Sequence, residues 1–230
     1  MPGEHIVKSY DEELALLKTK TTTMARTVEA QLTRAVQALI GRDLFLAKSI
    51  VRDDEKVNEL QRELESYTVR LLARRQPMAR DLRTVIAGLK TASDLERIGD
   101  YAANIALHVR DLNNVSLERP LDLLIGMGEI AAGMLRDIVE AYQKMDIQKA
   151  IEVWHCDDQI DGIYADLLGE LRECMTKDAR NIKAYTGLIF AARCCERIGD
   201  HVTNVAENIY FVEKGKPYHG EIVDDQKQPR

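Results

Sequence analysis

A five-residue block that occurs twice, as Glu96-Arg97-Ile98-Gly99-Asp100 and as Glu196-Arg197-Ile198-Gly199-Asp200, constrains the fold of this chain most strongly. Upstream of each block, further residues of the two halves match when they are 103 positions apart in the sequence. The second half is three residues shorter just before its last predicted helix, so the blocks themselves are 100 positions apart. The matching pairs are Met24 and Met127, Leu32 and Leu135, Val36 and Val139, Asp43 and Asp146, and Ala47 and Ala150. The sequence therefore predicts two copies of one unit of about one hundred residues.

Apolar residues recur at helical spacing along each unit, and aromatic residues make up only 5% of the chain, which favours helices over a β-sandwich or barrel. We predict helices over residues 11–40, 43–75 and 79–112, and again over 121–144, 146–175 and 178–214. Asp43 and Asp146 are placed to cap the second helix of each unit, and Pro77 ends the first of these. Short turns make consecutive helices antiparallel neighbours.

The predicted fold class is all-α, with two tandem, structurally similar antiparallel three-helix bundles. The polar stretch 113–116, followed by Pro120, is the best linker between them. We therefore place the first bundle at residues 1–115 and the second at residues 116–230, the latter with a polar C-terminal tail.

Charge and composition exclude several functional classes. A formal net charge of −6 argues against a nucleic-acid partner, because phosphate binding needs a positive surplus or face. No basic and apolar leader is visible, and no apolar run reaches the roughly 18 residues of a membrane span. The four cysteines include an adjacent pair and no CxxC motif. We expect reduced thiols, a cytoplasmic location and no direct insertion into a membrane.

An acidic ladder follows from the repeated block. Residues four apart share one helix face, so Glu96, Asp100 and Asn104 form one oxygen-bearing stripe, and Glu196, Asp200 and Asn204 form its copy. Helical phase puts these stripes opposite the apolar stripes and hence on the outside of each bundle. Such a stripe is most often a solvated face. Two identical copies with like charges four residues apart favour a bound cation instead.

The preceding helix of each unit can complete a cation site. Asp157 and Asp161 lie four apart there, and Asp54 and Asn58 are their equivalents. A set of oxygen ligands suits hard cations such as Mg²⁺, Mn²⁺ or iron, and does not suit zinc. Gly99 and Gly199, within helices, indicate that another backbone or a ligand approaches closely.

Other polar features give weaker indications of function. The pair Glu152 and His155 has di-iron spacing but occurs only once, and His201 points away from the ladder. A cluster of arginines around Pro77 is a solvated helix end or a docking patch; it comprises Arg70, Arg74, Arg75, Arg80 and Arg83. No phosphate-binding loop and no activated nucleophile is visible, so we expect no catalytic residues and no enzyme activity.

The chain resembles the PhoU family. The resemblance lies in the doubled E-R-I-G-D-x-x-x-N block, in residues 75–83 (R-Q-P-x-x-x-D-L-R) and in residues 157–161 (D-x-x-I-D), and it extends over about residues 5–215. It implies a pair of three-helix bundles with two E(D)xxxD motifs each, which can hold metal clusters on the surface. The ligands it implies are Glu96, Asp100, Glu196, Asp200, Asp54, Asp157 and Asp161. Asn58 departs from the motif, so the first half should bind metal less tightly.

The resemblance also implies a function. PhoU-like proteins repress the phosphate-starvation response when phosphate is plentiful, and they link the ATPase subunit of the phosphate ABC transporter to a phosphate-sensing histidine kinase. We thus expect a negative regulator of the phosphate regulon and of phosphate uptake, and a homodimer, with Asn104 and Asn204 as neutral ligands or supports. Two alternatives stay open: a ferritin-type metal-carboxylate oxidase or storage bundle, and a metal-free helical scaffold.

Overall fold

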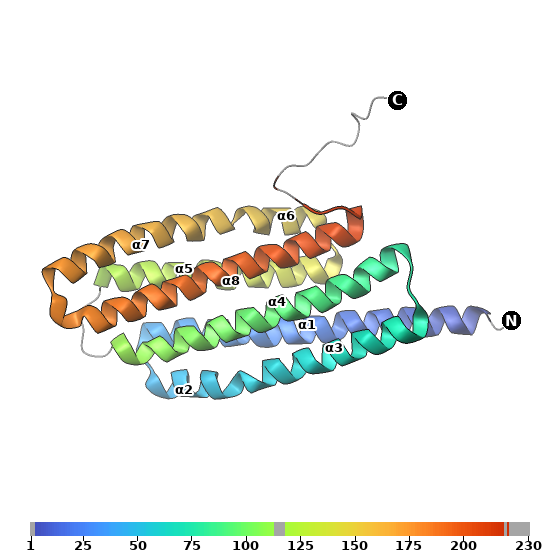
Figure 1. The fold of residues 1–230 in the computed structure, drawn as a ribbon, viewed down its shortest axis with the longest axis horizontal. Helices are drawn as coiled ribbons and strands as arrows, with labels where there is room; N and C mark the ends of the chain where they lie inside the picture. The colour runs from blue at the N-terminus through green and yellow to red at the C-terminus, as the bar shows by residue number, and fades with distance from the viewer. Residues whose placement is uncertain (1–2, 113–117, 219, 221–230) are drawn as a thin grey trace, which may run out of the picture.

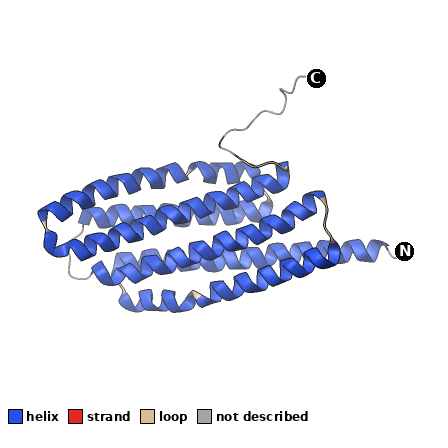
Figure 2. Cartoon of the chain, in the orientation of Figure 1, coloured by secondary structure: helices blue, strands red, loops and turns tan. Residues whose placement is uncertain are grey.

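The computed structural model describes residues 3–112, 118–218 and 220, and every regular element within these ranges is helical (Figure 2). The first half comprises α1 (Gly3–Gly41), α2 (Leu44–Asp53), α3 (Glu55–Arg75), α4 (Ala79–His108) and a 3-10 turn η1 (Val109–Leu112). The second half comprises α5 (Glu118–Lys144), α6 (Ile147–His155), α7 (Asp157–Lys177), a 3-10 turn η2 (Ala179–Asn181) and α8 (Ile182–Lys214). The all-α prediction is confirmed. The proposed boundary at 115/116 lies outside the described residues and stays a prediction.

The second predicted helix of each half is interrupted, which corrects the expectation of one continuous helix. The interruption lies at Asp54 between α2 and α3, and at Cys156 between α6 and α7. There the amide of Val57 donates to the carbonyl of Asp54, three residues back, at 2.9 Å, and Gln159 donates to Cys156 in the same way at 3.1 Å. This tighter hydrogen bond bends the helix without proline or glycine. Each acidic motif of α3 and α7 therefore begins at a bend.

Helix caps form where the sequence predicts them. The Asp43 carboxylate accepts hydrogen bonds from the amides of Phe45 and Leu46, both at 2.9 Å, and Asp146 accepts one from Lys149 at 3.1 Å. These bonds satisfy amides that have no partner within the helix. At the other end of α3, Gln76 adopts φ 45° before Pro77, and the chain turns back into α4.

The two halves pack side by side around one core. Figure 1 shows α4 and α8 adjacent in the middle of the molecule, α1 and α5 behind them, and the bent helices α2–α3 and α6–α7 at the outer edges. The predicted apolar stripes of α4 and α8 are buried, with Ile98, Ile105 and Ile198 fully enclosed. Burial of each such side chain contributes about 1.5–3 kcal/mol to the free energy of folding. One continuous hydrophobic cluster joins both halves, so the core is shared between them.

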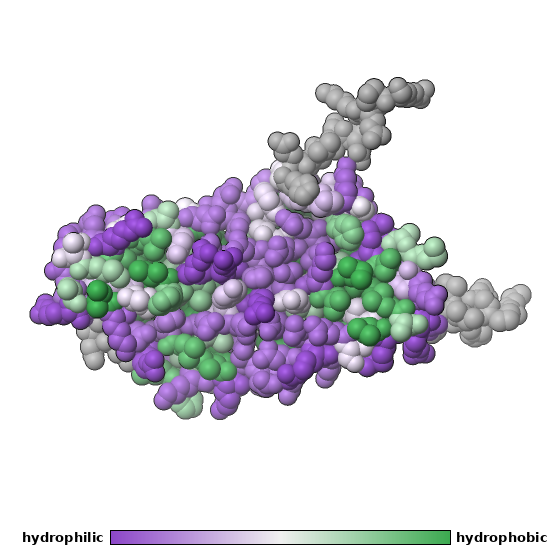
Figure 3. Space-filling model, viewed as in Figure 1, coloured by the Kyte–Doolittle hydropathy of each residue, from purple (hydrophilic) through white to green (hydrophobic). Residues whose placement is uncertain are grey.

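The surface is mixed. Figure 3 shows a polar band across the middle of one face, with apolar side chains gathered towards both ends of the molecule. Large exposed apolar residues include Phe45, which is 86% exposed, and Met78, which is 80% exposed. Among the described residues, no helix has the length and apolar character needed to cross a membrane.

Candidate metal centres

The acidic residues of the second half gather where the start of α7 packs against the middle of α8. Asp157 lies on α7 and Glu196 on α8, and both are half-buried because each helix covers part of the other. A Cβ atom at position 199 would collide with the Oδ1 atom of Asp157. Gly199 therefore lets a carboxylate lie directly against the backbone of α8. A close approach at this glycine was expected, but the approaching group is the Asp157 side chain and not a backbone or a ligand.

The electrostatics of this cluster are unfavourable without a cation. Burial, followed by the charges of Asp161, Asp200 and Glu196, raises the pKa of Asp157 to about 7. The pKa of Glu196 is also raised, first by burial and then by Asp200. Oδ1 of Asp157 and Oε2 of Glu196 are buried without a hydrogen-bond partner. Orphaned, mutually repelling carboxylate oxygens are the donor set that a hard cation would satisfy, so these residues fit the metal that the family resemblance implies.

Arginines of α8 partly neutralise the second cluster. Arg193 is paired with Glu196, and Arg197 lies 3.1 Å from the Oδ2 atom of Asp200. Within the described ranges, no group of three or more His, Cys, Asp or Glu side chains is arranged so that it could hold a metal ion. Binding of an ion would therefore require the carboxylates of this cluster to rearrange around it. The metal ligands stay a prediction.

The first half has the same layout with different partners. Burial and then Asp100 raise the pKa of Glu96, whereas burial and then Asp54 raise that of Asp100. Arg97 lies 3.4 Å from Asp100. Asp54, which directly precedes α3, thus lies close enough to these two acids of α4 to raise the pKa of both. Asn58 lies half-buried at the start of α3 and brings no charge to this cluster.

Gln31 of α1 is a site residue that the sequence analysis missed. Its Nε2 atom donates to the Oδ1 atom of Asp54 at 2.7 Å and to the carbonyl oxygen of Gly99 at 3.3 Å. A register comparison at the offset of 103 pairs Gln31 with Met134, and this change from polar to apolar was the available signal.

The two asparagines of the acidic ladders have different surroundings. Asn104 is exposed, and Asn204 donates from Nδ2 to the Oδ1 atom of Asp94 in the first half at 3.1 Å. His201 also contacts that oxygen, at 3.0 Å from Nδ1. Asn204 therefore supports the contact between α4 and α8.

The arginine cluster around Pro77 is largely engaged within the molecule. Arg75 pairs with Glu13, Arg80 pairs with Glu213, and Arg83 donates to the carbonyl oxygen of Val212 at 3.1 Å. Since Glu213 and Val212 belong to α8, Arg80 and Arg83 tie the two halves together. Arg70 and Arg74 are exposed.

Comparison with known proteins agrees with this fold. The PhoU domain model matches the chain twice, over residues 21–109 and 124–209. A phosphate-specific transport system accessory protein PhoU homolog of Caulobacter vibrioides is 43% identical over 217 residues, 93% of either chain. The phosphate-specific transport system accessory protein PhoU of Edwardsiella tarda is 34% identical over 226 residues, 98% of this chain and 93% of that protein.

Solved structures give the same result. The crystal structure of PhoU from Pseudomonas aeruginosa matches with a TM-score of 0.87 at 34% identity, over 90% of this chain and all of that one. The phosphate transport system regulatory protein PhoU from Streptococcus pneumoniae matches with a TM-score of 0.84 at 32% identity, over 91% of this chain and 99% of that one. The chain therefore belongs to the PhoU family.

Proposed function

We propose that this chain is a regulatory accessory protein of phosphate-specific transport, which represses the phosphate-starvation genes and restrains phosphate uptake when phosphate is plentiful. The observation that carries the proposal is the family match in both halves, since relatives covering nearly the whole chain are named as accessory proteins of that transport system. The pneumococcal neighbour, described as a regulatory protein of phosphate transport, supports the same role.

In this proposal the protein acts by binding and not by catalysis. It works in the cytoplasm, as a homodimer, and connects the ATPase subunit of the phosphate transporter to the phosphate-sensing histidine kinase. Exposed apolar side chains such as Phe45, Met78 and Phe190 offer contact area for protein partners. Arg70 and Arg74, which are exposed, are the part of the arginine cluster that an acidic partner could reach.

We further propose that the acidic clusters bind Mg²⁺, Mn²⁺ or iron. Asp157, Asp161, Glu196 and Asp200 would hold the ion in the second half, and Asp54, Glu96 and Asp100 would do so in the first. A bound cation would supply positive charge between helices whose carboxylates repel one another. The protein's own contribution is to hold Asp157 against α8, which Gly199 permits.

The ferritin-type alternative is not supported. Such an enzyme needs carboxylates that face the bundle interior. In the described part of the chain, the buried polar side chains are those of Thr21, Gln31, Thr68, Thr91 and Asn208, with no carboxylate among them. The acidic clusters lie between the outer helices and the central pair instead.

A deletion strain tests the regulatory role. We expect strains lacking this gene to express phosphate-starvation genes in phosphate-rich medium, and expect a plasmid copy to restore repression. A Leu95→Asp copy, which places a charge in the core and should unfold the protein, should fail to restore repression and serves as the negative control. Unchanged repression after deletion would contradict the proposal.

A further inference from the structure

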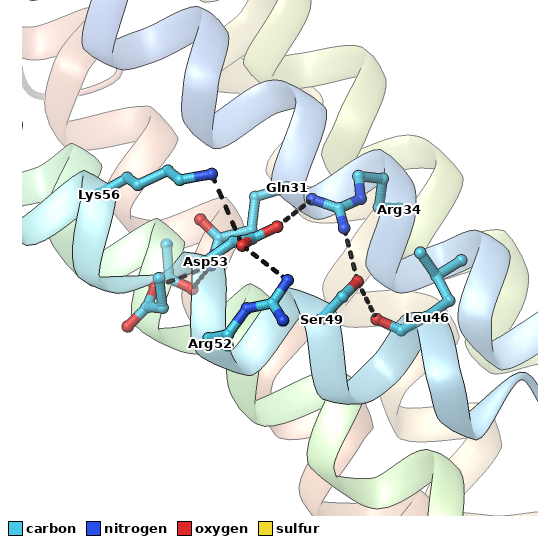
Figure 4. A network of polar contacts seen from close by, with 9 residues as sticks. Gln31, Arg34, Leu46, Ser49, Arg52, Asp53 and Lys56 are labelled. Carbon is cyan, nitrogen blue, oxygen red and sulfur yellow. Dashed lines mark hydrogen bonds and ion pairs between the residues drawn. The ribbon is translucent and has the colours of Figure 1, made fainter.

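Gln31 lies at the centre of the first acidic cluster. Its side chain extends from α1, is only 4% exposed, and meets both Asp54 at the start of α3 and the carbonyl of Gly99 on α4. Figure 4 shows it beside Asp53, at the bend between α2 and α3. One amide group thus bridges a carboxylate and a backbone carbonyl from two different helices.

Among the residues of the second half that the structure describes, no such bridge is present. Met134 occupies the equivalent position, is 3% exposed, and carries a thioether that cannot donate a hydrogen bond. The matching carboxylate, Asp157, keeps an Oδ1 atom that is buried and without a partner. The duplicated site therefore has a built-in donor in one copy and none in the other.

The amide of Gln31 is held by its nitrogen end alone. Its Oε1 atom is buried and has no hydrogen-bond partner. Turning the amide over would place Oε1 against two acceptor oxygens, which is unfavourable unless a cation lies between them. Carboxylate and carbonyl oxygens, which the N–H group now bridges, are also the ligands that hard cations take in proteins.

We propose that the Gln31 amide takes the place of a cation in the first half, so that this half is satisfied without metal whereas the second half depends on metal. The inference rests on the proposed metal binding. A cation entering the first half must displace a hydrogen bond to a charged group, which lowers its affinity by about tenfold or more. The two halves would then load at different metal concentrations.

Reciprocal substitution tests this assignment, because Gln and Met are of similar length. Gln31→Met is studied with the second site disabled by Asp157→Asn and Asp161→Asn. Met134→Gln is studied with the first site disabled by Asp54→Asn and Asp100→Asn. Mn²⁺ affinity is measured by titration with detection of free Mn²⁺ by electron paramagnetic resonance, and the metal-free melting temperature is measured in chelator.

Opposite changes are expected. Gln31→Met should tighten Mn²⁺ binding about tenfold and lower the metal-free melting temperature, because Asp54 loses its donor. Met134→Gln should weaken Mn²⁺ binding about tenfold and raise the metal-free melting temperature. Gln31→Glu replaces the donor with a carboxylate and adds a negative charge beside Asp54, so it should tighten Mn²⁺ binding and lower the metal-free melting temperature more than Gln31→Met does.

Two results would overturn the inference. Weaker or unchanged Mn²⁺ binding by Gln31→Met, with binding intact in the wild-type chain, would make Gln31 a ligand or a bystander and would leave the metal proposal standing. Absence of Mn²⁺ binding by the wild-type chain would overturn the metal proposal and this inference together, while the deletion phenotype would still decide the regulatory role.

Discussion

Replacing Asp157 with asparagine should stabilise the metal-free protein and weaken its binding of a divalent cation. Asparagine keeps the shape of the side chain and removes its charge. The Oδ1 atom of Asp157 is buried without a hydrogen-bond partner, and the charges of four other carboxylates act on this group. Removing the charge therefore removes a repulsion that only a bound cation would otherwise relieve.

The size of the effect follows from the pKa. Burial and the neighbouring carboxylates raise the pKa of Asp157 from 3.8 to about 7. For a fully shielded carboxyl group, this shift would cost about 4 kcal/mol of folding free energy above pH 7. Asp157 is only half-buried and solvent screens part of the repulsion, so we expect about 1–3 kcal/mol. For a chain of this size, each kcal/mol moves the melting temperature by about 2–4 °C.

The pH dependence has a defined sign. The folded chain keeps the proton of Asp157 up to about pH 7, whereas the unfolded chain loses it near pH 3.8. The folded state thus binds more protons between these values, and its stability falls as the pH rises from about 4 to 7. Asp157→Asn lacks this contribution, so its advantage should be small at pH 4.5 and full at pH 8.

Urea unfolding in chelator at both pH values measures the difference directly. Asp166→Asn, an exposed aspartate on α7 that is not among the charges acting on Asp157, serves as the matched control and should change stability by no more than about 0.5 kcal/mol. With saturating Mn²⁺ the order should reverse, because the wild-type chain gains more from the ion. Equal or lower stability of Asp157→Asn at pH 8 in chelator would refute the reasoning.

Two further predictions concern packing. Gly199→Ala should destabilise the protein by about 1–3 kcal/mol despite the better helix propensity of alanine, because the added Cβ would collide with Asp157. Gly169→Ala on α7, where no neighbouring atom lies within 4 Å, should instead stabilise the protein by up to about 1 kcal/mol. Chemical denaturation measures both changes. Ile198→Ala should lower the free energy of unfolding by about 2–5 kcal/mol, because Ile198 belongs to the core that both halves share. In calorimetry the variant should still unfold in one transition, at a lower temperature. Two separate transitions would contradict a shared core.

Much of the fold could be predicted from local patterns. Asp43 caps its helix because a cap needs only residues close in sequence. The stripe that contains Ile98 is buried because helical spacing determines which face is apolar. The block repeated at Gly99 and Gly199 indicated close packing, and both positions are tightly surrounded.

Other features depend on contacts between distant segments. The bend at Asp54 keeps helical dihedral angles, with φ −58° and ψ −33°, and involves no proline or glycine, so nothing local indicates it. The role of Gln31 depends on where α1 crosses α3 and α4. Likewise, Asn204 lies four residues from Asp200 but bonds to Asp94, because α4 packs against its face of α8.

The central claim about the site is that the second acidic cluster binds a hard cation. Metal analysis of the wild-type protein purified without chelator, beside a Glu196→Ala/Asp200→Ala variant with the same helix content, tests it most directly. We predict bound Mg²⁺, Mn²⁺ or iron in the wild-type protein and a clear loss of it in the variant. Equal metal content in the two proteins would contradict the claim.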